Sequence, residues 1–301
     1  MKALYYIALI FSIVTPASLA KADEQPRCTD NDQTIDLWRE IRANAKQLDA
    51  NKHALALTSC LASPNPELRD QIAYEVLTYW LRQDKLDPEV IYNIKEQLLP
   101  WLNLGAGEPG GPHSFARAFA ALILSELVRD DRRHTRWQGG DIDELITLAT
   151  NMFRAERDYR GLDPEYGWIH TIAHGSDLLW RLSLHPKTLV AQQGEILEAI
   201  SSQLSNLTAP AFVFNEADRL ARPVASIFFN TEVKPDDKIN WIESLAKPAP
   251  WDSWNTAFAS VQGMARLHNT KHFLRALNAA IIEYDNDEIK QTLNEALTQL
   301  P

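Results

Sequence analysis

Residues 166–184 read YGWIHTIAHGSDLLWRLSL and carry a clear helical pattern. At about 100° per residue, four polar side chains share a stripe about 60° wide: His170, His174, Asp177 and Arg181. The rest of the circumference is apolar or small, and Gly175 and Ser183 are positions where another helix can come close. The pattern predicts a helix that is buried nearly all round and has one titratable strip facing a groove or a polar seam.

The same helical periodicity extends over most of the chain and predicts an all-α fold. Proline stands at the expected first position of helices near Pro66-Glu67 and Asp87-Pro88-Glu89, with acidic residues in the first turn. The only short candidate for a strand is 211–214. The predicted helices cover residues 68–81, 90–102, 113–128, 141–155, 166–184, 188–207, 216–229, 238–245, 253–267, 271–284 and 288–297.

The spacing of these helices predicts their arrangement. Helix pairs recur at roughly 40–50 residues, which is the spacing of HEAT- or armadillo-type solenoids of stacked antiparallel helices. An α/α-toroid, which stacks helix hairpins but closes on itself, has the same periodicity and is the alternative. No break in composition divides the chain, so residues 23–301 are expected to form a single α-helical repeat domain.

The N-terminus indicates export. Residues 1–22 contain Lys2, an apolar run and a small-residue end at Ala20-Lys21-Ala22, which is typical of a signal peptide. The predicted compartment is the periplasm, with no membrane contact after cleavage. Cys28 and Cys60 are therefore expected to form a disulfide, which would stabilise the fold by about 3–4 kcal/mol on the chain-entropy estimate.

Charge and missing motifs exclude several functions. The chain has 30 basic and 40 acidic residues, and both basic residues of the signal, Lys2 and Lys21, are lost on cleavage, which leaves 28 against 40 or −12. This balance argues against nucleic acid as a partner and favours a protein or small-molecule ligand. The sequence has no phosphate loop, dinucleotide fingerprint, serine-nucleophile elbow or carboxylate pair at glycosidase spacing.

The stripe allows three chemical interpretations, one of which is a ligand site without a metal. His170, His174 and Asp177 could bind a divalent metal, with Glu216, His113 or Asp158 as the fourth ligand. Thr171 stands where a His-Glu-x-x-His protease has its glutamate, so that mechanism is not expected. The third is a structural hydrogen-bond network between packed helices, with Arg117, Arg160 or Arg219 as the partner of the stripe.

Arg117 is expected to be covered on its helix and to need a carboxylate partner, because a buried guanidinium requires compensation. On the predicted helix at 216–229, the pairs Glu216–Arg219 and Asp218–Arg222 have helical spacing.

Several blocks resemble those of the bacterial domain of unknown function 2785 family. In family order they are RDQIAY (69–74), SFARAFAAL (114–122), DYRG (158–161), GWIH (167–170), AHGSDLL (173–179), VF (213–214) and EADRLA (216–221). The resemblance covers about 69–221, and it implies a helical fold and a shared polar site but no activity. The residues of that site are His170, His174, Asp177, Glu216, Arg219, Arg117, Asp158 and Arg160.

Two functions therefore stand as hypotheses. The first is an exported binding or scaffold module with a polar groove around His170, His174 and Asp177. The second is a metal-dependent hydrolase that uses the same residues, with Glu216 or Asp158 as general base.

Overall fold

The computed structural model describes Cys28 and residues 32–301, so the predicted signal peptide at 1–22 lies outside the described residues. The first half of the described chain contains α1 (Asp32–Asn44), α2 (Ala50–Ser59), η1 (Cys60–Ala62), η2 (Glu67–Tyr74), α3 (Glu75–Arg82), α4 (Pro88–Leu98), η3 (Leu99–Asn103), α5 (His113–His134) and α6 (Gly139–Ala155). The second half contains β1 (Leu162–Asp163), β2 (Gly167–Trp168), α7 (Thr171–Ser183), α8 (Val190–Leu204), α9 (Glu216–Phe229), α10 (Pro235–Ala246), α11 (Trp254–Ala257), α12 (Val261–Ala280) and α13 (Asp287–Gln299). The predicted all-α class is confirmed.

Local start signals explain where these helices begin. Asp87 is the N-cap of α4 and Pro88 is its first residue, as the sequence predicted. Pro66 precedes η2, which is a π-helix and continues directly into α3. At α13 the side chain of Asn286 accepts a hydrogen bond from the Ile289 amide, which satisfies one of the free N–H groups of the first turn.

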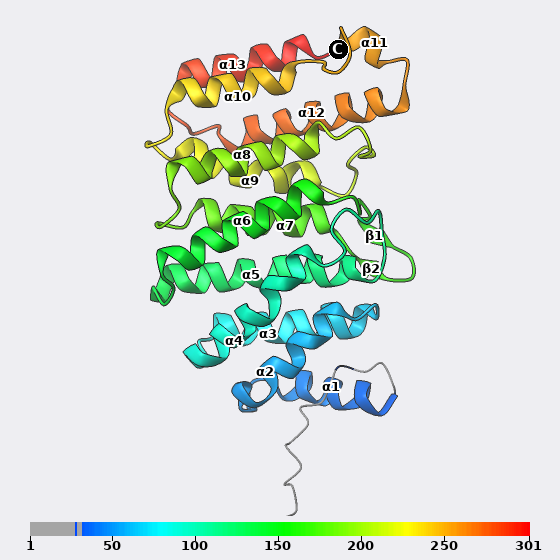
Figure 1. Ribbon diagram of the computed structural model, residues 1–301, viewed down its shortest axis with the longest axis vertical. Coiled ribbons are helices and arrows are strands. Elements are labelled where there is room, and N and C mark those ends of the chain that lie inside the picture. Colours follow the sequence, from blue (N-terminus) through cyan, green and yellow to red (C-terminus); the bar gives the residue numbers. More distant parts are fainter. Residues whose placement is uncertain (1–27, 29–31) are drawn as a thin grey trace, which may run out of the picture.

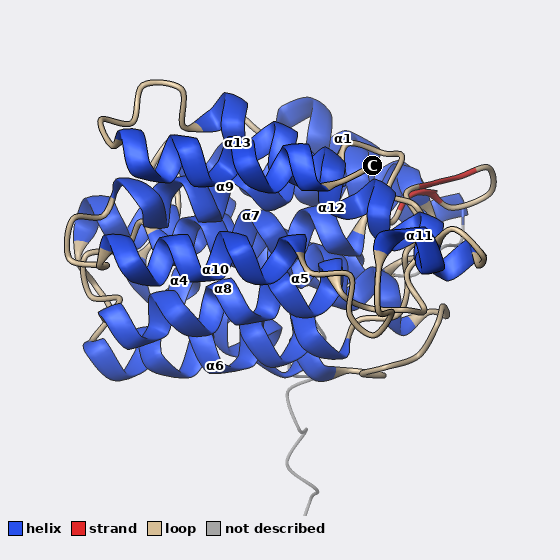
Figure 2. Ribbon diagram, turned by 90° about the horizontal axis from the view of Figure 1, so that it is seen from above, coloured by secondary structure: helices blue, strands red, loops and turns tan. Residues whose placement is uncertain are grey.

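The helices stack along the long axis, with α1 at one end and α13 at the other (Figure 1). In one layer α5 packs on α7, α7 on α9 and α9 on α12, while α6, α8 and α10 follow one another in the second layer. Figure 2 shows this stack from above, with the β1–β2 hairpin at one end of the helices. The first and last described helices, α1 and α13, lie at opposite ends of the stack (Figure 1). The assignment to a HEAT- or armadillo-type solenoid, as against an α/α-toroid, stays a prediction, and so does the single domain.

Small residues allow close approach within this stack. A side chain at Gly175 of α7 would lie 2.8 Å from the ring of Phe153 on α6, so only glycine allows this contact. The hydroxyls of Ser183 on α7 and Ser226 on α9 are in contact. Gly175 and Ser183 are therefore positions where a neighbouring helix comes close, as the sequence pattern predicted.

The predicted break between the helices at 253–267 and 271–284 does not exist, because α12 runs unbroken from Val261 to Ala280. Asn269, inside this helix, donates to the Pro210 carbonyl at 2.9 Å and accepts from the Phe212 amide at 2.7 Å. Because the loop forms hydrogen bonds with the amide side chain of Asn269, this side chain does not compete for the hydrogen bonds of the helix backbone. The strand candidate at 211–214 belongs to that same loop.

Cys28 and Cys60 form the predicted disulfide, with their Cα atoms 5.0 Å apart. It ties the chain near the start of the described region to η1, where Cys60 is fully buried. None of the described helices is both long enough and apolar enough to span a membrane.

Candidate functional site

The predicted helix at 166–184 begins five residues late. Leu162–Asp163 pairs antiparallel with Gly167–Trp168, and α7 starts only at Thr171. The turn between the strands contains Pro164, and Gly167 has a φ of 67°, which is a conformation that glycine adopts without strain. His170 is itself left-handed, with a φ of 55°, and is therefore the N-cap of α7 and not part of the helix.

The hairpin is held against η2 by Arg69. This guanidinium is fully buried between the rings of Phe115 and Phe119, at 4.8 and 4.9 Å from their centroids. It donates to the carbonyl oxygens of Tyr166 at 2.6 Å and Trp168 at 3.0 Å. The position of the hairpin is therefore determined by a residue almost a hundred positions away in the sequence.

His170 lies between the hairpin and α9. Its Nε2–H donates to the carbonyl oxygen of Phe214 at 2.9 Å, since a carbonyl can only accept. The imidazole stacks on the indole of Trp168 with ring centroids 5.0 Å apart, and the Trp168 side chain is 42% exposed. Burial lowers the pKa of His170 to about 4, so the ring is neutral near pH 7.

His174 is buried one turn further along α7. Its ring centroid is 5.8 Å from that of His170, and it meets the ring of Phe119 edge-on at 5.1 Å. Its Nδ1 has no hydrogen-bond partner in the described part of the chain. Burial lowers the pKa of His174 well below its usual range. Repulsion from a charged His170 ring is a second, smaller cause in the same direction.

Asp177 is the charged centre of the stripe. Its carboxylate contacts Arg219 of α9 and accepts from Arg222 of the same helix at 3.4 Å. Burial raises the pKa of Asp177, while these arginines favour its charged form. Among the arginines proposed as partners of the stripe, Arg219 is the one that contacts Asp177. Arg219 and Arg222 bind across to α7, not to Glu216 and Asp218 of their own helix.

The other predicted site residues stabilise loops beside the stripe. Arg117 forms the expected buried ion pair, and its partner is Glu156 at 3.0 Å. Asp158 is fully buried and pairs with Arg160 at 2.6 Å. Glu216 is buried and accepts from the Phe214 amide at 2.8 Å, so it stabilises the turn that precedes α9.

Sequence reasoning missed two residues of η2 as site residues. Burial raises the pKa of Asp70 to about 6, and Asp70 accepts from the same Arg69 nitrogen that binds the Trp168 carbonyl. Tyr74 packs edge-on against Phe119, the ring that His174 also contacts. Both residues belong to the RDQIAY block, but no local spacing could connect them to α7.

The group of described residues whose ligand atoms lie within 4.8 Å of one another is not the stripe. Among the described residues, the group of ligand atoms close enough for one ion is Asp84, Asp130 and His134, which is far from the stripe in sequence. In that group Arg133 pairs with Asp84 at 3.1 Å and Arg136 contacts Asp130, so its carboxylates are already neutralised. The fourth-ligand candidate His113 contacts Glu108 at 3.1 Å. The metal site at His170, His174 and Asp177 stays a prediction, and so does the hydrolase that depends on it.

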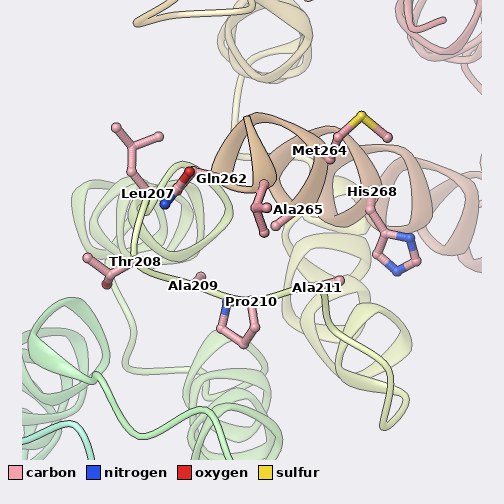
Figure 3. Close-up of a pocket in the computed structure, with 10 residues that line it drawn as sticks. Leu207, Thr208, Ala209, Pro210, Ala211, Gln262, Met264, Ala265 and His268 are labelled. Atoms are coloured by element: carbon pink, nitrogen blue, oxygen red, sulfur yellow. The ribbon is translucent and has the colours of Figure 1, made fainter. Parts of the chain in front are cut away.

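The described part of the chain also has a cavity outside the stripe. This cavity of about 570 Å³ lies between residues 207–211 and the start of α12. Figure 3 shows Ala265 and His268 of α12 across from Pro210 and Ala211. Its walls are mostly apolar, and it shares no residue with the stripe.

The fold and the site define an all-α protein of stacked helices with a partly buried, arginine-bound polar site on α7. The chain belongs to the family described as Protein of unknown function (DUF2785), whose sequence model matches residues 102–278. That match begins after the RDQIAY block and extends well beyond the predicted limit near residue 221, to the end of α12. Comparisons with the curated proteins and with the solved structures find no match for this chain.

Proposed function

We propose that the protein is a binding module whose ligand contacts the surface formed by the hairpin, α7 and α9. The observation that carries this proposal is the stack of Trp168 on His170, because an indole exposed to 42% is held rigidly beside a charged cluster. Rigid aromatic side chains with one open face are typical anchors for ligands and partners. The surface lies in the region that the family match covers.

The surrounding contacts support a ligand surface held in one geometry. Arg69 holds the hairpin through its hydrogen bond to the Trp168 carbonyl. His170 is held by its hydrogen bond to the Phe214 carbonyl, and the indole of Trp168 stacks on it. Trp168 also meets the Phe214 ring edge-on, with centroids 6.0 Å apart. Because these groups are already ordered, a ligand would lose little affinity to ordering them.

A photo-crosslinking experiment tests this proposal. Trp168 is replaced by the photoreactive residue benzoylphenylalanine in the full chain, and Tyr92 of α4, which is 50% exposed and outside the site, receives the same replacement. After irradiation in growing cells, we expect an adduct of reproducible mass at position 168 and none at position 92, measured by mass spectrometry. Adducts at both positions, or at neither, would contradict the proposal.

We also infer that the chain is exported to the periplasm. The Cys28–Cys60 disulfide supports this, because such bonds persist in oxidising compartments. The intact mass of protein isolated from a periplasmic extract should correspond to a chain without residues 1–22. A chain that keeps this segment, or one found only in the reducing cytoplasm, would overturn the inference.

A further inference from the structure

Positive charge accumulates on the side of α3, α5, α7 and α9 that carries the stripe. Two buried carboxylates, Glu126 and Asp177, are surrounded by five arginines, which we call the arginine face: Arg82, Arg129, Arg181, Arg219 and Arg222. Glu126 accepts from Arg82 at 2.9 and 2.7 Å and lies 3.6 Å from Arg129. This excess of arginine stands out in a chain whose formal net charge is −10.

Arg181 is near both carboxylates of this face but makes no direct contact with either. Among the described residues it has no ion pair, and its guanidinium lies over the ring of Trp180 at 4.1 Å. Burial lowers the pKa of Arg181; the charge of Glu126, and then that of Asp177, opposes this shift, while the charges of Arg129 and Arg132 add to it. A partly desolvated cation among other cations costs free energy, which a bound anion would recover.

The guanidiniums are close enough to act together. Arg222 lies 5.6 Å from the same Trp180 ring that Arg181 covers, and Arg219 and Arg222 share the carboxylate of Asp177. The Arg219 and Arg222 side chains are 32% and 44% exposed, so both keep N–H groups that face solvent. Planar guanidinium groups in this arrangement match the oxygen atoms of a carboxylate or a phosphate.

We infer that Arg181, Arg219 and Arg222 form an oxyanion-binding site for a carboxylate or phosphate group of the ligand. The inference rests on the proposed binding function and names the chemistry of its ligand. Asp177 contacts two of the three arginines, Arg219 and Arg222. Arg219 also acts electrostatically on His170, the ring on which the exposed indole of Trp168 stacks. The screening length near physiological salt is about 8 Å, so the local positive charge and not the net charge of the chain governs a bound anion.

Calorimetric titration of the full mature chain tests this site. Inorganic phosphate and succinate are titrated separately, each against sodium chloride at the same ionic strength. We expect saturable binding of at least one probe, and the probe that binds identifies phosphate or carboxylate as the recognised group. Arg181→Gln should weaken that binding about tenfold, since one charge-assisted contact is lost. The matched control Arg154→Gln removes an arginine of α6 and should leave it unchanged.

Thermal unfolding in chloride separates this site from a structural role. Without a bound oxyanion, Arg181→Gln should leave the melting temperature unchanged or raise it, because an uncompensated charge is removed. A lower melting temperature, equal probe affinity in Arg181→Gln, or no binding of either probe would overturn the inference. If neither probe binds while the crosslink at position 168 forms, the binding function stands and only its oxyanion chemistry is wrong.

Discussion

Arg117→Met is expected to lower the free energy of unfolding by about 3–5 kcal/mol, because it leaves the buried carboxylate of Glu156 without its counter-ion. Both side chains are about 1% exposed, and the two nitrogen–oxygen contacts measure 3.0 Å. Arg117 also donates to the carbonyls of Leu104 and Gly105, at 2.7 and 2.8 Å, so the loop before α5 should loosen as well. Urea unfolding followed by circular dichroism measures the change.

Two further variants test the mechanism of this loss. Glu156→Gln in the Arg117→Met background removes the orphaned charge and should recover part of the stability, since the amide oxygen can still accept from the amides of Arg157 and Asp158. Arg154→Met, which breaks a 3.7 Å pair with the exposed Glu198, should cost less than about 1 kcal/mol. Equal losses in Arg117→Met and Arg154→Met would show that burial of the pair does not matter.

Arg69→Met is expected to cost at least about 3 kcal/mol and to release the β1–β2 hairpin from η2. The side chain is fully buried, and besides its bonds to Tyr166 and Trp168 it donates to the Ser63 carbonyl at 3.1 Å. Its loss removes one buried hydrogen bond, to Ser63, and the two part-buried bonds that hold the hairpin. Hydrogen exchange should therefore accelerate at the amides of Ile169 and His170, which bind the carbonyls of Gly161 and Arg160.

The conservative variant makes this prediction specific. Arg69→Lys keeps the charge but has three donors on a single nitrogen, so it cannot reach acceptors on both sides and should rescue little. Arg39→Met, which removes an exposed arginine paired with Glu67 at the start of η2, is the matched control and should leave hairpin exchange unchanged. Full protection of Ile169 in Arg69→Met would contradict the role assigned to Arg69.

Much of the candidate site was visible in the sequence as residue types and faces. The periodicity located α9 with the bounds 216–229 that the structure has, and it placed His174, Asp177 and Arg181 on one side of α7. The boundary of α7 was wrong because the turn signal at Gly167 was read as part of a continuous helix. The left-handed backbone of His170 follows from that hairpin, whose position depends on Arg69.

The sequence by itself determined the helical class, the disulfide between Cys28 and Cys60, and the need of Arg117 for a carboxylate, because these follow from periodicity, residue chemistry and the cost of burying a charge. Only the tertiary structure decided which groups meet. Arg117 pairs with Glu156. Arg219 pairs with Asp177 of α7 and not with Glu216 of its own helix. The physical reason is that helical spacing describes neighbours three or four residues apart, whereas these partners are about 40 residues apart and are selected by how the layers pack and exclude water.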